Sequence, residues 1–310
     1  MDKQRLKKQK GGNSLMKIKN FSITGILILT FLLIFTFSTA AYEEAPMLTE
    51  KVEQGEIDPV AERLPQEPLV IEPWHEIGEY GGTWNRITTY EDIADMRLAM
   101  YGFSLLRYDD NLEVVEGLAK DWEANADKTE WTIYLRKGLK WSDGAPFTVD
   151  DILFWWEDMA TDNEHPQPVP RFMVNGGESA EIIKIDDYTF KVKYVKPNPI
   201  FHYHLAMWTN GGLGAYIAAP KHYLKQFHPE YNDDAKNYEE IEVKQEWWRN
   251  PECPVVTAWK VDKYEAGGRS VLSRNPYFYA VDTEGNQLPY IDEIVIDYSS
   301  DIEVIKTKVI

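Results

Sequence analysis

LLRYDDNLEVVEGLAKDWEANADKTEWTIYLRKGLKWSDGAPFTVDDILFWWEDM (Leu105–Met159) is the stretch with the clearest structural pattern in this chain of 310 residues. Near its middle, the apolar residues Trp131, Ile133 and Leu135 alternate with more polar neighbours. Alternation with a period of two is typical of a strand that is buried on one face. We therefore predict a half-buried strand over residues 130–136.

A helix is predicted shortly after this strand. Thr148 is a good N-cap residue, and Asp150 and Asp151 follow in the first turn, where carboxylates favour the positive end of the helix dipole. Apolar residues then recur at helical spacing, namely Ile152, Trp155, Trp156 and Met159. Because such a stripe is more often core than ligand platform, we expect these side chains to pack in the core.

Further extended segments follow along the chain. The alternating residues of Ile182–Val195 predict a hairpin. Thr257–Asp262 and Ser270–Asn275 predict a second pair of strands around a Gly-Gly turn, and Ile291–Tyr298 predicts another strand. Strands interleaved with short helices indicate a mixed α/β (α+β) fold class.

Composition and charge exclude several classes of protein. Apolar residues make up 44% of the chain, and 51 Asp and Glu against 33 Lys and Arg give a formal net charge of −18. A protein with this much negative charge repels the phosphate backbone of a nucleic acid. We therefore expect no nucleic-acid partner. Cys253 is the one cysteine, which excludes an internal disulfide and a CxxC site, and we expect a buried free thiol there. The motifs HExxH, GxSxG and GxxxxGK do not occur, so we expect no enzyme.

The first 41 residues have the order of a secretory signal peptide, with basic, then apolar, then small residues. The apolar run covers Phe21–Phe37, and we expect cleavage after Ala40 or Ala41. An uncleaved anchor helix is the alternative, since the run is near the lower length limit of a bilayer span. The start is either Met1 or Met16. Because no cysteine follows the run, we expect no lipid anchor and a periplasmic or extracellular protein.

Four segments together resemble the peptide-type extracytoplasmic solute-binding proteins of ABC importers (family 5, which includes oligopeptide, dipeptide and nickel binders). The quoted stretch has the LRKG and KWSDG runs and the Thr-capped helix of that family. APKHYLKQFHPEY (Ala219–Tyr231) and TAWKVDKYEAGGRSVLSRNPYFY (Thr257–Tyr279) agree with it, and LPYIDEIVIDY (Leu288–Tyr298) resembles the strand that leads toward its third lobe. The resemblance covers nearly all of residues 80–310 in the family's order.

The resemblance implies a periplasmic-binding-protein-like lobe built from two domains. It places a scaffold domain at residues 80–104 and 200–297 and a smaller inserted domain at 105–199. The acidic, proline-dotted segment 42–79 is expected to be an extended arm. Residues 298–310 resemble only the start of a C-terminal lobe, so the chain is expected to be C-terminally truncated, with the second lobe missing. In the family, ligand is enclosed between two lobes by hinge closure.

The function that the resemblance implies is capture of oligopeptides outside the cytoplasm and delivery to the transmembrane permease subunits of an ABC transporter. We expect a monomer that uses no cofactor. Two loop segments are the predicted ligand contacts, where glycines would let the ligand approach the backbone. The residues are Tyr101, Gly102, Phe103, Trp208, Asn210 and Gly211.

An oligosaccharide is the alternative ligand, because family relatives also carry sugars and indole rings can stack on sugar faces. The candidate stacking residues are Trp84, Trp208, Trp247, Trp248 and Trp259. A glycoside-cleaving enzyme would need a pair of carboxylates, but an acidic surface supplies such pairs at random.

Nickel is a third possible ligand, because imidazole suits this metal. The four histidines concerned are His202, His204, His222 and His228. His202 and His204 are expected to share a strand face with no third ligand in reach, and a packing or capping role is simpler for the other two. We therefore expect no metal site.

Overall fold

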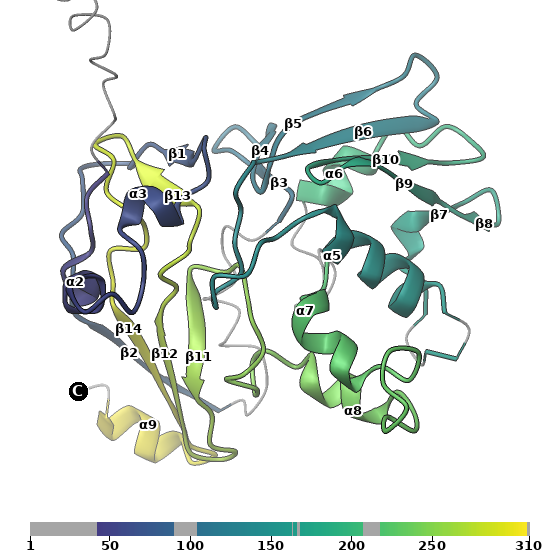
Figure 1. Cartoon of the computed structure of the whole chain (residues 1–310). Coiled ribbons are helices and arrows are strands. Elements are labelled where there is room, and N and C mark those ends of the chain that lie inside the picture. Colours follow the sequence, from purple (N-terminus) through teal and green to yellow (C-terminus); the bar gives the residue numbers. More distant parts are fainter. Residues whose placement is uncertain (1–41, 90–103, 163, 166–167, 207–217, 309–310) are drawn as a thin grey trace, which may run out of the picture. The chain divides into compact units, whose positions relative to one another are not determined.

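The computed structural model describes residues 42–89, 104–162, 164–165, 168–206 and 218–308 (Figure 1). The chain divides into two units, Met1–Ala41 and Tyr42–Ile310, and every described residue belongs to the second. The segment expected to be a signal peptide therefore lies outside the described residues. No helix within the described ranges combines the length and the apolar character needed to cross a membrane.

Two four-stranded sheets organise the described residues, with one at the left of Figure 1 and the other at its upper right. The first sheet has the order β11 (Trp259–Lys263), β12 (Arg269–Arg274), β14 (Glu293–Tyr298), β2 (Thr83–Thr88). Strands β14 and β2 pair in parallel, whereas the pairs β11–β12 and β12–β14 are antiparallel. The predicted pair of strands over 257–275 and the strand over 291–298 are thus confirmed.

The second sheet is antiparallel throughout and has the order β5 (Ala119–Ala124), β6 (Glu130–Leu135), β10 (Thr189–Lys193), β9 (Glu181–Asp186). Strand β6 buries Trp131, Ile133 and Leu135 and leaves the residues between them partly exposed, as the alternation predicts. Strands β9 and β10 form the predicted hairpin.

The smaller elements connect and cover these sheets. Short strand pairs are β3 (Leu106–Tyr108) with β4 (Val114–Glu116), β7 (Val174–Asn175) with β8 (Glu178–Ser179), and β1 (Leu69–Ile71) with β13 (Ala280–Asp282). Helical elements are α2 (Pro46–Glu53), α3 (Val60–Arg63), α5 (Val149–Leu153), η2 (Phe154–Ala160), η3 (Arg171–Met173), α6 (Phe201–Ala206), α7 (Lys221–Leu224), η4 (Lys225–Phe227), α8 (Glu239–Lys244) and α9 (Ile302–Lys308).

The predicted helix start at Thr148 is confirmed in detail. The Thr148 hydroxyl accepts from the N–H of Asp150, and the N–H of Thr148 donates to the Asp151 carboxylate at 2.9 Å. This reciprocal capping begins α5, which continues as the π-helical η2. The stripe of Ile152, Trp155, Trp156 and Met159 is buried, so it belongs to the core as expected.

Residues 42–79 differ from the expected extended arm, since they contain α2, α3 and β1. Leu48, Leu64 and Leu69 are buried, and β1 pairs in parallel with β13. The acidic and proline-rich composition hides this packing, because it is created by contacts with residues some two hundred positions later in the chain.

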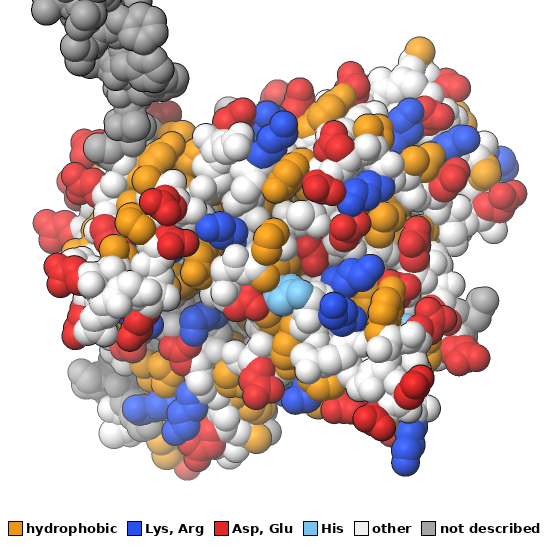
Figure 2. Space-filling model, in the orientation of Figure 1, with side chains coloured by type: hydrophobic (Ala, Val, Ile, Leu, Met, Phe, Trp, Pro, Cys, Tyr) orange, Lys and Arg blue, Asp and Glu red, His pale blue; other side chains and the backbone are white. Residues whose placement is uncertain are grey.

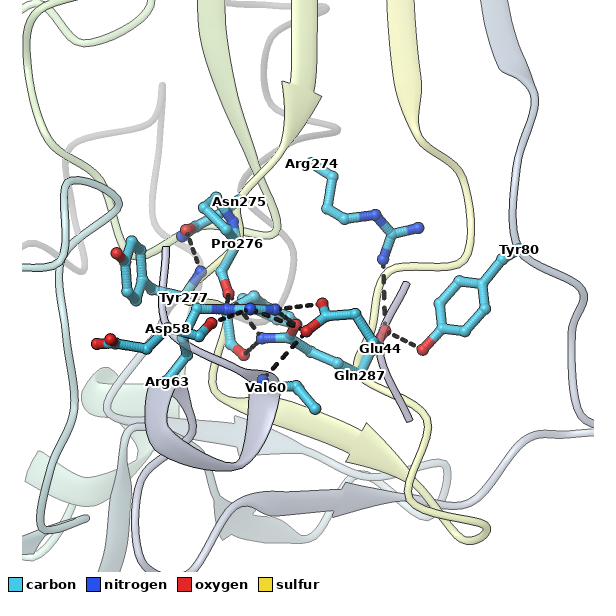
Figure 3. Close-up of polar contacts among 11 residues, drawn as sticks. Glu44, Asp58, Val60, Arg63, Tyr80, Arg274, Asn275, Pro276, Tyr277 and Gln287 are labelled. Atoms are coloured by element: carbon cyan, nitrogen blue, oxygen red, sulfur yellow. Dashed lines mark hydrogen bonds and ion pairs between the residues drawn. The ribbon is translucent and has the colours of Figure 1, made fainter. Parts of the chain in front are cut away.

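The buried Arg63 is the centre of the contacts that hold this segment (Figure 3). Its guanidinium makes a two-pronged ion pair with Glu44, at 2.6 and 3.0 Å. It also donates to the carbonyls of Asp58 and Pro276 and to the side chain of Gln287. All five N–H donors of the side chain are therefore used.

A second buried arginine, Arg274, lies beside this network. It contacts residues that come just before the parallel strands β2 and β14. Arg274 and the Tyr80 hydroxyl both donate to the backbone carbonyl of Gln287 (Figure 3). Arg274 also pairs with Asp292 at 3.0 Å, and its guanidinium lies 4.9 Å from the centre of the Tyr80 ring. Because Tyr80 precedes β2 and Asp292 precedes β14, these contacts set where both strands begin.

We expect Arg63→Ala to lower the free energy of unfolding by about 3 kcal/mol, because it leaves the Glu44 carboxylate and several carbonyls without their donor. Urea denaturation of the full chain measures this change. Lys120→Ala is the matched control, since Lys120 pairs with Glu67 at 3.1 Å on the surface and its loss should cost less than about 1 kcal/mol. Equal effects of the two substitutions would contradict the role given to Arg63.

Candidate functional site

Strands β2 and β14 end side by side and define one candidate region. Thr88 is the register partner of Tyr298, and the N–H of Ser299 donates to the carbonyl of Thr88 at 2.9 Å. We call Thr88, Tyr298 and Ser299 the carboxyl edge. Ligands of open sheets commonly bind beyond the carboxyl ends of parallel strands, so this edge is a candidate place for a solute.

Charge beside the carboxyl edge is neutralised within the sheet. Arg269 of β12 contacts both carboxylate oxygens of Asp297, at 2.6 and 3.1 Å. The paired register of β12 and β14 brings these two residues together. The cation therefore compensates the carboxylate next to the edge.

The six predicted ligand contacts all lie outside the described residues. They are Tyr101, Gly102, Phe103, Trp208, Asn210 and Gly211. Their role stays a prediction. The first three follow β2 in the chain and the last three follow α6, which is all that the described elements establish about them.

The candidate stacking tryptophans are not brought together into one platform. Trp84, in the edge strand β2, exposes 36% of its surface and has the Arg86 guanidinium 5.3 Å from its ring centre. Trp259 is in β11 at the opposite edge of the same sheet, and its indole N–H donates to the carbonyl of Ile291. Trp247 and Trp248 follow α8, and Trp208 lies outside the described residues.

The expectation that His202 and His204 share a strand face is wrong, because both are in helix α6. Residues two apart in a helix point to different sides. The His202 ring stacks on Trp131 with 4.9 Å between centres, and the His204 ring stacks on Phe172 at 5.6 Å. Burial lowers the pKa of both histidines, so both favour the neutral form.

The other two histidines of the nickel alternative make protein contacts. His222 Nε2 lies 2.8 Å from an oxygen of Asp143, and His228 is buried with its Nε2 2.8 Å from the carbonyl of Asp158. Burial by itself would raise the pKa of Asp143, but the hydrogen bonds from His222 and from the N–H of Ala145, together with the nearby charge of His222, lower that pKa overall. Within the described ranges, no three His, Cys, Asp or Glu side chains are grouped so that they could hold a metal.

A pocket of about 620 Å³ lies among η2, α7 and the residues that follow α8. Trp155, Leu224, Trp247 and Trp248 contribute to its apolar wall. The sequence pattern predicts Trp155 as core, and it is both buried and part of this wall. The pocket itself had no sequence signal, since its residues are spread over about a hundred positions.

One wall of the pocket is polar. His165 Nε2 lies 2.9 Å from Glu242 Oε1, and the amide of Gln245 donates to the same oxygen at 2.8 Å. Glu246, which also lines the pocket, pairs with Arg249 at 3.4 Å. The ionisable side chains at this wall are thus Glu242, Glu246 and His165, and the pairing of Arg249 with Glu246 offsets one carboxylate.

Charged side chains of both signs lie on the surface of the described residues. On the face shown in Figure 2, acidic and basic side chains are interspersed, and no broad basic patch forms among the residues drawn in colour.

Comparison with known proteins identifies what this chain is similar to. Residues 113–308 match the family model described as "Bacterial extracellular solute-binding proteins, family 5 Middle". The periplasmic alpha-galactoside-binding protein of Rhizobium meliloti (strain 1021) is 32% identical over 275 residues, which are 82% of this chain and 38% of that protein.

Two solved structures resemble the chain over most of its length. One is an oligopeptide-binding protein OppA, with a TM-score of 0.75, 38% identity, and coverage of 86% of this chain and 43% of that one. The other is the periplasmic binding protein MelB of Agrobacterium fabrum C58 in complex with stachyose, with a TM-score of 0.70, 31% identity, and coverage of 84% and 41%. The chain spans about two fifths of the length of these relatives.

The buried thiol of Cys253 gives a direct test of how the segment after α8 packs. Cys253 is only 7% exposed, and burial raises its pKa to about 12. At pH 8 the thiolate fraction is then far smaller than in an unfolded chain. We expect a bulky disulfide reagent to modify the native chain at least about 100-fold more slowly than the urea-unfolded chain. Equal rates would show that the thiol is exposed.

Proposed function

Because the chain belongs to the bacterial extracellular solute-binding proteins of family 5, we propose that it captures an oligosaccharide of the α-galactoside class and delivers it to the permease of an ABC transporter. The family consists of binding proteins, not enzymes. In this proposal the protein works outside the cytoplasm, and its partners are the solute and the transmembrane subunits.

The observation that carries the choice of solute is the similarity to two sugar-binding relatives. The alpha-galactoside-binding protein matches 82% of the chain, and the stachyose complex matches 84% of it. This favours the oligosaccharide over the oligopeptide that the sequence resemblance implies. The exposed Trp84 ring in β2 supplies an aromatic face of the kind on which sugar rings stack.

An oligopeptide is the second candidate, and two observations favour it. The OppA structure is 38% identical to the chain. In addition, β2 is an edge strand, and its outer side has no partner among the described strands. Such an edge can pair with the backbone of an extended peptide.

We also propose that the two sheets are the cores of two domains within one lobe. The sheet of β11, β12, β14 and β2 draws its strands from residues 83–88 and 259–298, within the expected scaffold domain. The sheet of β5, β6, β10 and β9 draws its strands from residues 119–193, within the expected inserted domain. Insertion of one sheet into the chain of the other supports this division.

Calorimetric titration and thermal unfolding of the full chain test the solute. We expect stachyose to raise the stability, by about 2.7 kcal/mol at a concentration one hundred times Kd, because a ligand that binds only the folded state stabilises it. Maltotetraose, a tetrasaccharide without galactose, is the matched control and should have little effect. A pool of tetrapeptides probes the second candidate.

Stabilisation by the peptides and not by stachyose would replace the proposed solute with an oligopeptide. Equal stabilisation by stachyose and maltotetraose would keep a sugar-binding protein but remove the preference for α-galactosides. No response to any of the three would contradict solute capture by this chain.

A further inference from the structure

The KWSDG run (Lys140–Gly144) carries part of the family resemblance, yet none of its residues lies at the carboxyl edge or in the described lining of the pocket. It forms a tight turn between β6 and α5, in which the N–H of Trp141 donates to the carbonyl of Ala145 at 2.8 Å. The N–H of Gly144 donates back to the carbonyl of Trp141 at 2.9 Å. We call Lys140–Gly144 the KWSDG turn. It lies within residues 119–193, from which every strand of the second sheet comes.

Ser142 holds the KWSDG turn to a segment that precedes the first sheet. Its N–H donates to the carbonyl of Val255 at 2.8 Å, and its hydroxyl oxygen accepts from the N–H of Val255 at 3.0 Å. Val255 is only 3% exposed, so Ser142 satisfies both polar backbone groups of a buried residue. Two hydrogen bonds between the same two residues fix their relative direction as well as their distance.

Two charged residues of the turn reach further segments. The Asp143 carboxylate lies 2.8 Å from Nε2 of His222, which is in α7. The Lys140 ammonium donates to the carbonyl of Glu62 in α3 at 2.9 Å. Both partners lie outside residues 105–199, the segment expected to form the inserted domain.

The closest packing of the turn is at Gly144, which lies directly against the ring of Tyr277. A Cβ atom built on Gly144 would come within 2.9 Å of atoms of that ring. Its φ of +88° is also in the region that favours glycine. A side chain at this position is therefore opposed both by the backbone conformation and by the neighbouring ring.

The contacts of the turn are gathered at one end of the first sheet. Val255 precedes β11 and Tyr277 follows β12, and the start of β11 is paired with the end of β12 through Trp259 and Arg274. Strands β14 and β2 begin at the same end of the sheet. The KWSDG turn thus lies at the end opposite to the carboxyl edge.

We propose that the KWSDG turn is a rigid joint that couples the two sheets, so that the lobe they form moves as one body. The proposal rests on the division into two domains proposed above. The paired hydrogen bonds of Ser142 and the close packing of Gly144 allow one orientation of the turn on the hairpin of β11 and β12. Because the joint lies at the remote end of the first sheet, it does not cover the carboxyl edge. Closure around a solute moves this lobe as a whole.

Urea denaturation of the full chain labelled with 5-fluorotryptophan, followed by fluorine NMR, tests this coupling. Trp131 in β6 reports on the second sheet, and Trp259 in β11 reports on the first. Their resonances among the eleven tryptophans are assigned through single Trp→Phe variants. Coupled sheets unfold together, so we expect the native resonances of both residues to disappear at the same urea concentration.

Gly144→Ala and Gly177→Ala form a matched pair of substitutions. The two glycines have φ values of +88° and +89°, and Gly177 is in the turn between β7 and β8. A Cβ atom at Gly177 meets nothing within 4 Å, whereas one at Gly144 meets the Tyr277 ring. The backbone strain is therefore similar, and only Gly144→Ala disturbs the joint. We expect Gly144→Ala to separate the two urea midpoints by about 0.5 M or more, and Gly177→Ala to leave them coincident.

Ser142→Ala is a milder test of the same joint. It removes the hydroxyl acceptor of the Val255 N–H without a steric clash, so it should separate the midpoints in the same direction and by less. This variant decides the question if the Gly144→Ala chain does not fold.

Separate midpoints in the unsubstituted chain, or coincident midpoints in every joint variant that folds, would overturn the joint. A separation in Gly177→Ala as large as in Gly144→Ala would overturn it as well, because backbone strain alone would then explain the effect. The measurements contain no solute. A failure of solute capture therefore leaves the joint standing, and loss of the joint leaves the proposed solute standing.

Discussion

The hydrogen bonds of the buried Arg63 guanidinium are the interaction on which the packing of the N-terminal segment depends. A charge taken out of water is tolerated only when it is paired and its donors are satisfied, and here all five donors have acceptors. Those acceptors come from residues 44–58 and from residues 276–287. The pairing therefore holds residues 44–63 against residues 276–287 in a single arrangement.

This attachment has a consequence for the strands that lead to the carboxyl edge. Tyr80 and Arg274 share the carbonyl of Gln287, directly before the parallel strands β2 and β14. With their starts held, the two strands run in register to Thr88 and Tyr298. Three of the six predicted ligand contacts, Tyr101, Gly102 and Phe103, lie in the segment of the chain that follows β2.

The many tryptophans of the chain have several different roles. Trp131 and Trp141 are core residues, Trp84 presents a face to solvent, and Trp247 is buried while it lines a pocket. A large aromatic ring can fill the core in one place and line a surface or a pocket in another. Composition alone therefore indicates that aromatic binding surfaces are possible, and only the arrangement of the chain shows where.

The sequence by itself determined the local features, which are the alternation of β6, the capping of α5 by Thr148 and the hairpin of β9 and β10. It also determined the family, through short motifs in a set order. These depend on residues a few positions apart, whose spacing is visible in the chain. Tertiary structure alone decided that residues 42–79 pack instead of extending, that His202 and His204 lie on a helix, and that Trp247 lines a pocket. Each of these depends on contacts between residues far apart in the chain, because burial and pairing are properties of the assembled structure.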